Sequence, residues 1–237
     1  MQSSQLVFCI SEFVVLLFSL SVHESAHAWV ASRLGDQTAR MLGRVSLNPM
    51  DHIDPIGTLL IPAIGIFGPL FGLGYLGGFI FGWAKPVPIV SRNFRNFRRD
   101  DTLVSLAGPA SNLLLALLAF AALAAIAIAT PHGHRDVIVA FLYADGQDVG
   151  IAPQPVAFLC SMMVLLNLIL CIFNLIPIPP LDGSHILRHV LPYNAAQVFD
   201  RITGIASYFL IIIAGRAILG FLLPPVLGLF YSALGRI

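Results

Sequence analysis

Long apolar stretches dominate the chain, and several of them are long enough to cross a membrane. Four such stretches cover residues Leu6–Leu34, Thr102–Thr130, Pro155–Ile176 and Ile202–Leu223. A helix rises about 1.5 Å per residue, so about 20 apolar residues cross a hydrocarbon core of about 30 Å. The pattern predicts an all-α polytopic membrane protein. We expect a single domain over residues 1–237, with a core over about 6–187 and C-terminal helices over about 200–237.

A fifth apolar stretch, Ile56–Trp83, differs from the others because proline and glycine interrupt it. It contains Pro62, Pro69 and several glycines, which make a uniform helix unfavourable. A broken backbone at membrane depth is tolerated only where protein shields it or where it faces a cavity. This stretch is therefore predicted to be a re-entrant or broken segment. The tail Pro224–Ile237 is apolar but short, and we expect a half-span or an interfacial helix there.

The composition supports an integral membrane protein. Hydrophobic residues make up 57% of the 237 residues and charged residues only 11%, whereas a soluble domain carries about 25% charged residues. The net charge of +1 gives no reason to expect a nucleic-acid partner. The three cysteines are scattered and have no metal-ligand spacing.

The basic residues indicate how the spans are oriented. Eight of them lie in two segments, and they are Arg33, Arg40, Arg44, Lys85, Arg92, Arg95, Arg98 and Arg99. The connection Pro131–Gln154 has only Arg135 among three aspartates. Because cytoplasmic loops carry an excess of Lys and Arg, both basic segments are expected to be cytoplasmic. Both can be cytoplasmic only if Ile56–Trp83 crosses the membrane an even number of times, and the total of four to six crossings stays open.

The second half of the first apolar stretch contains an HExxH motif formed by His23, Glu24 and His27. Two histidines four residues apart lie on one face of a helix, where their imidazoles can share a metal ion. Glu24 lies beside them, where it could take the proton of a water molecule that the metal activates. Ionisable side chains at membrane depth are costly, which favours a functional role. The alternative is a helix with two structural histidines and a locally paired glutamate.

A catalytic zinc ion usually has three protein ligands, so a third ligand must come from elsewhere in the chain. One candidate is Asp182, in the Pro-rich turn Asn174–Gly183 that follows the third long span. Another candidate region is Asn48–Gly57, just after the first span. With the inferred orientation, Asp182 lies towards the cytoplasmic side, at the same end as the HExxH motif. The alternative role for Asp182 is a turn or helix-capping residue.

The two motifs together resemble the site-2 protease family of intramembrane zinc metalloproteases. HExxH in a first helix followed by NLIPIPPLDG, over residues 174–183, carries the resemblance. Three further segments look like those of the compact branch of the family, namely GRVSLNPMDHIDPIGT (43–58), GWAKPVPIV (82–90) and LAGPASNLLLA (106–116). The resemblance covers about Val22 to Leu187. It implies a three-helix catalytic core with one or two extra C-terminal helices, and no peptide-binding or sensory accessory domain.

The resemblance also implies roles for individual residues. It implies that His23, His27 and Asp182 bind one Zn²⁺ ion and that Glu24 is the catalytic base. It further links Asn174 to substrate binding or to support of the active site.

Other polar residues have two interpretations each. Asn112 lies inside the second long span, where its amide could hold substrate backbone, stabilise an oxyanion or join two helices. His52 could orient a ligand or shape a Pro-rich turn. The roles of Glu12, His185 and the arginines of Arg92–Arg99 stay open, although the arginines suit an anionic lipid surface.

The predicted function is hydrolysis of peptide bonds within or near transmembrane helices of substrate proteins. We expect a multi-pass protein of a bacterial cytoplasmic membrane, with the lipid bilayer and a transmembrane protein substrate as partners and the active site towards the cytoplasm. The alternatives are a metal-ion transporter, which would use the same ligands as a transit site, and a catalytically idle scaffold that binds membrane helices. The substrate, its cleavage site, the regulation and the oligomeric state are not predicted.

Overall fold

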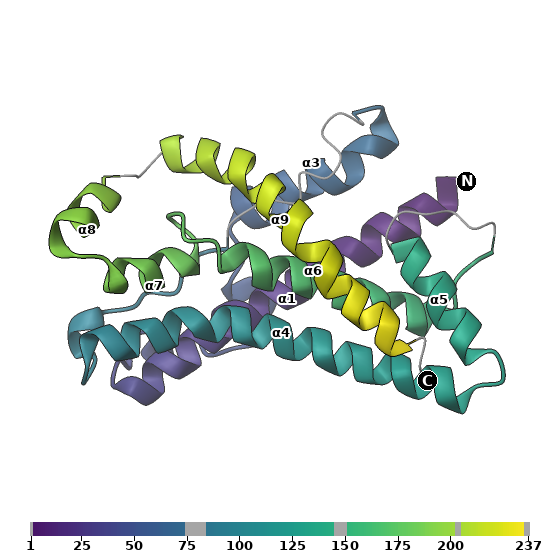
Figure 1. Cartoon of the computed structure of the whole chain (residues 1–237), viewed down its shortest axis with the longest axis horizontal. Coiled ribbons are helices and arrows are strands. Elements are labelled where there is room, and N and C mark those ends of the chain that lie inside the picture. The colour runs from purple at the N-terminus through teal and green to yellow at the C-terminus, as the bar shows by residue number, and fades with distance from the viewer. Residues whose placement is uncertain (1, 74–83, 145–150, 202–204, 235–237) are drawn as a thin grey trace.

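The computed structural model describes residues 2–73, 84–144, 151–201 and 205–234, and the regular structure in these ranges is entirely helical. The predicted all-α class is therefore confirmed. The α-helices are α1 (Gln2–Leu34), α2 (Thr38–Met41), α3 (Ile61–Phe67), α4 (Phe97–Ala129), α5 (Gly133–Ala144), α6 (Pro155–Asn174), α7 (Asp182–Val190), α8 (Tyr193–Phe199) and α9 (Ile205–Leu234). Figure 1 shows α7 and α8 at one end of the molecule and α5 with the N-terminus at the other.

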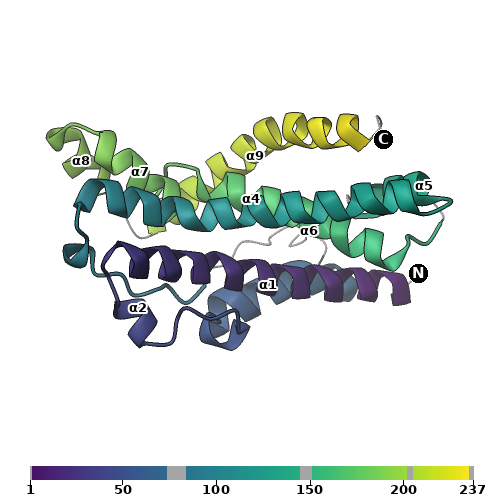
Figure 2. The same ribbon diagram turned by 90° about the horizontal axis from the view of Figure 1, so that it is seen from below.

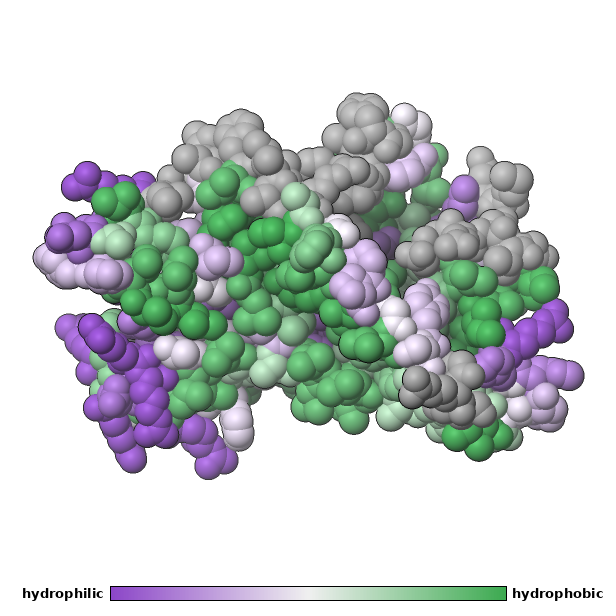
Figure 3. Space-filling view, viewed as in Figure 1, coloured by the Kyte–Doolittle hydropathy of each residue, from purple (hydrophilic) through white to green (hydrophobic). Residues whose placement is uncertain are grey.

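Four helices among the described residues are long and apolar enough to span a membrane. They cover Gln5–Leu34, Phe97–Ala129, Pro155–Asn174 and Ala217–Leu234. Figure 3 shows apolar surface across the middle of the molecule and hydrophilic residues gathered towards its two ends. The chain is therefore a multi-pass membrane protein.

The helices α1, α4 and α6 form the centre of the fold. Each of the three contacts the other two, and Figure 2 shows α1 and α4 running side by side along the long axis. Small residues on α4, including Ala116 and Ala119, lie in the same buried cluster as Phe158 and Met162 of α6. Such small side chains let membrane helices approach each other closely. Helix α9 packs on the same cluster through Leu223 and Phe230.

The connection between α4 and α6 contains a helix that the charge argument did not anticipate. Helix α5 buries Val137, Ala140, Phe141 and Ala144 against α4 and α6. These residues follow the spacing of one helical face. That face of α5 is therefore part of the hydrophobic core, and the opposite face is exposed.

The C-terminal tail differs from the prediction. Helix α9 continues without a break from Ile205 through Pro224 and Pro225 to Leu234, so the tail is neither a separate half-span nor a separate interfacial helix over its described part. Helices in a membrane tolerate proline where neighbouring groups satisfy the freed backbone.

The described part of the stretch Ile56–Trp83 consists of short helical pieces. A π-helical turn covers Pro55–Leu60, α3 follows, and a 3-10 turn covers Gly68–Phe71. Residues 74–83, on which the rest of that prediction falls, lie outside the described residues. The pieces pack on the N-terminal half of α1, where the ring centroids of Phe13 and Phe67 are 5.9 Å apart.

Two buried charged residues hold the basic loops together near the other end of α1. The guanidinium of Arg44 donates hydrogen bonds to the backbone carbonyls of Asp51, Lys85 and Pro86. Asp36 is fully buried and accepts hydrogen bonds from Thr38 and from the loop that precedes α4, namely from the Val90 N–H and the Asn93 amide. Although burial opposes its ionisation, these hydrogen bonds lower the pKa of Asp36.

Candidate metal centre

The two histidines of the HExxH motif face inwards from α1. His23 and His27 are one helical turn apart, and both side chains are buried. Their rings meet edge to face with centroids 4.7 Å apart, and their Nε2 atoms are 3.0 Å apart. The helical spacing read from the sequence therefore brings both Nε2 atoms to one point.

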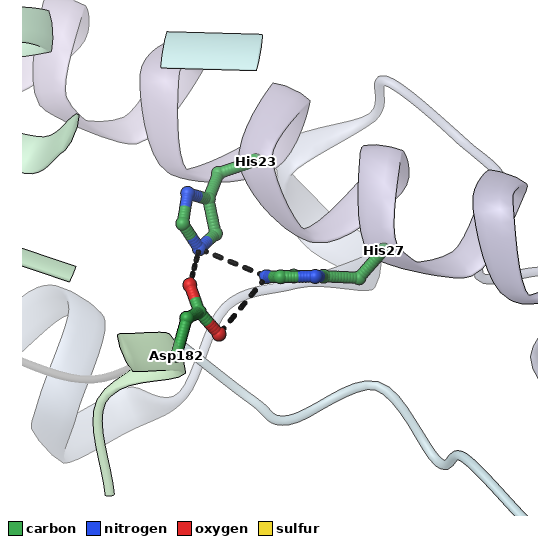
Figure 4. A group of neighbouring side chains, drawn as sticks. All are labelled: His23, His27 and Asp182. Carbon is green, nitrogen blue, oxygen red and sulfur yellow. Dashed lines mark hydrogen bonds and ion pairs between the residues drawn. The ribbon is translucent and has the colours of Figure 1, made fainter. Parts of the chain in front are cut away.

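Asp182 reaches the same point from the first turn of α7 (Figure 4). Its Oδ2 lies 3.2 Å from Nε2 of His23, and its Oδ1 lies 3.4 Å from Nε2 of His27. The N-terminal end of a helix favours a carboxylate. Of the two regions considered for a third ligand, the structure thus brings Asp182 of the Pro-rich turn to the histidines.

Gly183 allows α7 to begin where it does. A Cβ atom at this position would lie 2.2 Å from the carbonyl oxygen of Leu175 and 2.8 Å from that of Ile176. No residue with a side chain fits against backbone so close. The glycine therefore lets the start of α7 fold back on the end of α6, which sets the position of Asp182.

The arrangement of these three side chains fits a zinc ion. Nδ1 of His27 lies 2.7 Å from the carbonyl oxygen of Val104, which can only accept a hydrogen bond, so Nδ1 carries the proton. In the neutral ring, Nε2 then carries a lone pair, and it points at Nε2 of His23 and at the carboxylate. Such a group of electron donors can hold a cation between them, and two histidines with one carboxylate are a common catalytic zinc set.

The convergence of these donors is selective. Among the residues that the structure describes, His23, His27 and Asp182 are the one group of His, Cys, Asp and Glu ligand atoms that lie within 4.8 Å of one another. Zinc bound there would be held by these three side chains.

Helix α4 closes a further side of the site with a glycine. A Cβ atom on Gly108 would lie 2.4 Å from Cε1 of His23 and 2.4 Å from Nε2 of His27. Glycine inside a helix costs about 1 kcal/mol relative to alanine, so the position needs a compensating reason. The reason here is space, because any larger residue would overlap the rings of His23 and His27.

Comparisons with known proteins decide the family. The model of peptidase family M50 matches residues 76–216. The chain is 38% identical over 180 residues to a Bacillus subtilis protein named "Putative zinc metalloprotease YwhC", covering 76% of this chain and 68% of that protein. It is 32% identical over 216 residues to "Putative zinc metalloprotease Rip2" of Mycobacterium tuberculosis, covering 91% and 68% respectively. The chain belongs to peptidase family M50. No solved structure matches it significantly.

Membership of the M50 family confirms the resemblance seen in the sequence motifs. It makes the chain a metalloprotease and Zn²⁺ its metal ion. The roles of individual residues rest on the geometry described above and on the chemistry that it allows. Glu24, the predicted base of this M50 peptidase, is half-buried on α1 between the two histidines.

The three predicted supporting residues have different surroundings. Asn112 is fully buried on α4, and its amide nitrogen lies 3.2 Å from Nδ1 of His23. Asn174 donates its amide hydrogen bond to the carbonyl of Leu170, one turn back in its own helix. His52 is buried in the loop after α1, where its Nε2 lies 2.7 Å from the carbonyl oxygen of Ser46. Of the three, Asn112 is the residue that contacts a predicted ligand of the M50 site.

A second polar contact fastens α7 to α4, and the sequence did not reveal it. Oδ2 of Asp101 accepts a hydrogen bond from Nε2 of His189 at 2.7 Å and lies 3.6 Å from Nδ1 of His185. The Asp101 carboxylate raises the pKa of His185. His185 and His189 lie one and two turns after Asp182 on α7. Their contact with Asp101 anchors this helix to α4 and so helps to fix the position of Asp182.

Proposed function

We propose that this M50 peptidase hydrolyses peptide bonds within or near the transmembrane helices of other membrane proteins. The observation that carries the proposal is the depth of the candidate metal centre. His23 and His27 belong to the membrane-spanning part of α1, Gln5–Leu34, and both are buried. An active site at this depth suits a peptide bond that also lies in the membrane.

The chemistry follows from the side chains that converge there. Zn²⁺ held by His23, His27 and Asp182 would act as a Lewis acid towards water and the scissile carbonyl. Glu24 would accept the proton of the attacking water and return it to the leaving amine. Gly108 leaves the face of the two rings free of side-chain atoms, as the site requires.

The substrate must lose helical structure locally before it can react. A helix engages its carbonyls in hydrogen bonds with residues four positions on, so the scissile bond is shielded until a turn unwinds. The stretch Ile56–Trp83 is proposed as a wall or gate for this step. Its described part packs on α1 and consists of short interrupted turns, and the sulfhydryl of Cys9 on α1 donates to the carbonyl of Ile66 at 3.2 Å.

The proposed location is a bacterial cytoplasmic membrane with the active site towards the cytoplasm. The basic loop residues support this orientation. Arg33 lies in the last turn of α1, close after the HExxH motif, and Arg98 and Arg99 lie in the first turn of α4.

The test is cleavage of a transmembrane substrate in proteoliposomes by wild type and by Glu24→Gln. We expect the variant to retain zinc and to lose about 100-fold or more in cleavage rate, as removal of a general base does. Glu12→Gln is the matched control, because Glu12 is the other glutamate of the chain and also lies on α1. Products are identified by mass spectrometry.

Three results would contradict the proposal. Cleavage that survives in Glu24→Gln would exclude the mechanism. Zinc binding by a wild type that cleaves no membrane substrate would favour the scaffold. Transport of zinc into the proteoliposomes would favour the transporter.

A further inference from the structure

Helix α4 presents three successive turns to the HExxH motif. Val104, Gly108 and Asn112 are spaced by four residues and so share one face of α4. The Val104 carbonyl contacts His27, the bare Cα of Gly108 faces both rings, and the Asn112 amide contacts His23. Each histidine therefore has its own polar partner on α4.

The partner of His27 determines which nitrogen of that ring carries the proton. The Val104 carbonyl accepts the Nδ1–H and leaves the lone pair on Nε2, the atom that faces Asp182. A histidine that binds metal through one nitrogen usually donates the other N–H in this way.

His23 needs the same arrangement, because its Nε2 also faces Asp182. Its Nδ1 must then carry a proton and requires an acceptor. The Asn112 side chain is the group at hydrogen-bond distance, with its amide nitrogen 3.2 Å from Nδ1. A half-turn of the carboxamide exchanges its nitrogen and oxygen without displacing other atoms, and it places the oxygen against Nδ1.

The surroundings of Asn112 support that orientation. Its Oδ1 is buried and has no hydrogen-bond partner among the described residues. Burial of an unsatisfied carbonyl is costly; after the half-turn the oxygen accepts the Nδ1–H of His23, and the amide nitrogen takes the position that the oxygen leaves. Asn112 is fully buried and lies on the Nδ1 side of the ring, whereas the three ligand atoms converge on the Nε2 side.

We propose that Asn112 is a positioning residue for the zinc site: its side-chain oxygen accepts the Nδ1–H of His23 and keeps the Nε2 lone pair directed at the metal. The inference rests on the zinc site of the proposed function and does not depend on the substrate. It gives the two histidines equivalent partners on one helix, a carbonyl of the main chain and a carbonyl of a side chain.

The test compares zinc affinity in Asn112→Leu and Asn112→Asp. Leucine keeps the approximate volume but removes the acceptor, and we expect a 10- to 100-fold loss of zinc affinity, about the range found when a hydrogen-bond partner of a metal-binding histidine is removed. Aspartate restores an acceptor, so Asn112→Asp is expected to bind zinc within about threefold of wild type.

The matched control is Asn167→Leu. Asn167 is also fully buried in a helix interface, where it donates to Oγ of Ser19 at 2.9 Å. Its loss should lower the unfolding temperature without a change in zinc affinity. Affinity is measured by competition with a chelator, and the visible spectrum of the Co²⁺-substituted protein reports the geometry of the ligands. Retention of the monodisperse elution profile shows that each variant is folded.

The outcomes separate the inference from the proposed function. Wild-type affinity in folded Asn112→Leu would overturn the positioning role, and so would an equal loss in Asn167→Leu. Loss in Asn112→Asp as large as in Asn112→Leu would show that the amide nitrogen is required, which contradicts the assigned proton position. The proposed function fails by a different result, a zinc-bound wild type that cleaves no membrane substrate.

Discussion

Replacing Gly108 by alanine adds a single methyl group at the point where α4 meets the rings of His23 and His27. The new Cβ would lie 2.4 Å from Cε1 of His23 and 2.4 Å from Nε2 of His27. Ordinary van der Waals contact begins near 3.4 Å, so the rings or the helix must move by about 1.0 Å. Metal–ligand distances tolerate only about 0.2 Å of error. The displacement is therefore several times larger than the zinc site can absorb.

The same substitution should leave the fold largely intact. Alanine favours the helix by about 1 kcal/mol over glycine, which offsets part of an overpacking cost of about 1–3 kcal/mol. We therefore expect folded protein whose zinc affinity is reduced by at least about 100-fold, equivalent to about 2.7 kcal/mol. Chelator competition measures the affinity, and the zinc content of purified protein gives an independent value.

The control for this prediction is Gly220→Ala on α9. A Cβ at Gly220 would meet no atom within 4 Å, so this variant should keep wild-type zinc affinity and become slightly more stable. Wild-type zinc affinity in a folded Gly108→Ala variant would refute the reasoning, because it would mean that the rings do not need the space that the glycine leaves.

Two further predictions concern the helix that carries the third ligand. In Gly183→Ala the new Cβ would lie 2.2 Å from the Leu175 carbonyl oxygen. The start of α7 must then shift, and zinc affinity should fall at least about tenfold. Unchanged affinity would show that α7 adjusts without moving the Asp182 carboxylate. The second prediction is a pH dependence. Asp101 raises the pKa of His185. Their ion pair therefore stabilises the folded state fully below about pH 6.5, the ordinary pKa of histidine. This stabilisation is lost as the pH rises through the higher pKa of His185 in the folded state. In the metal-free protein, amide hydrogen exchange in α7 should therefore speed up with pH more steeply than the intrinsic exchange rate does. Asp101→Asn should abolish this additional pH dependence. If the additional dependence persists in the variant, the ion pair is not its cause.

The proximity of the two histidines was predictable from sequence because helical periodicity alone places residues four apart on one face. His23 and His27 needed no tertiary information, and the apolar pattern before them located their helix. The position of Asp182 could not be predicted from helical periodicity alone. It depends on the turn between α6 and α7, and on whether the chain between α1 and α4 crosses the membrane an even or an odd number of times. The family resemblance named Asp182 for that place, and the orientation inferred from the basic residues stays a prediction.

The α4 contribution could not be read in the same way. Val104 acts through its backbone carbonyl, which every residue possesses, and Gly108 acts through the space it leaves. A glycine in an apolar helix equally suits close helix packing. Only the relative rotation of α1 and α4 shows that Val104, Gly108 and Asn112 face the histidines, and rotation is a tertiary property.

Two of the expected supporting residues show the limits of motif reasoning. Asn174 and His52 lie in segments that resemble family motifs, but in this structure each bonds to nearby backbone. The Asn174 amide donates to the carbonyl of Leu170, and Nε2 of His52 lies 2.7 Å from the carbonyl oxygen of Ser46. Conversely, the apolar face of α5 was present in the sequence. The helical spacing of Val137, Ala140 and Phe141 marks this face, whereas the acidic residues and histidines around it are typical of an exposed loop.

Zinc binding by His23 and His27 of α1 together with Asp182 of α7 would link the supply of metal to the lifetime of the protein. Helix α7 packs on α4, and its acidic ligand meets α1 at the two histidines. An ion held by both helices acts as a cross-link that the unfolded chain lacks, and a ligand at 100 times its dissociation constant stabilises the folded state by about 2.7 kcal/mol. In a zinc-starved cell the folded state would thus lose this stabilisation, and the protein would lose its activity with it. Its abundance would then follow zinc availability, because quality-control proteases would remove the loosened form.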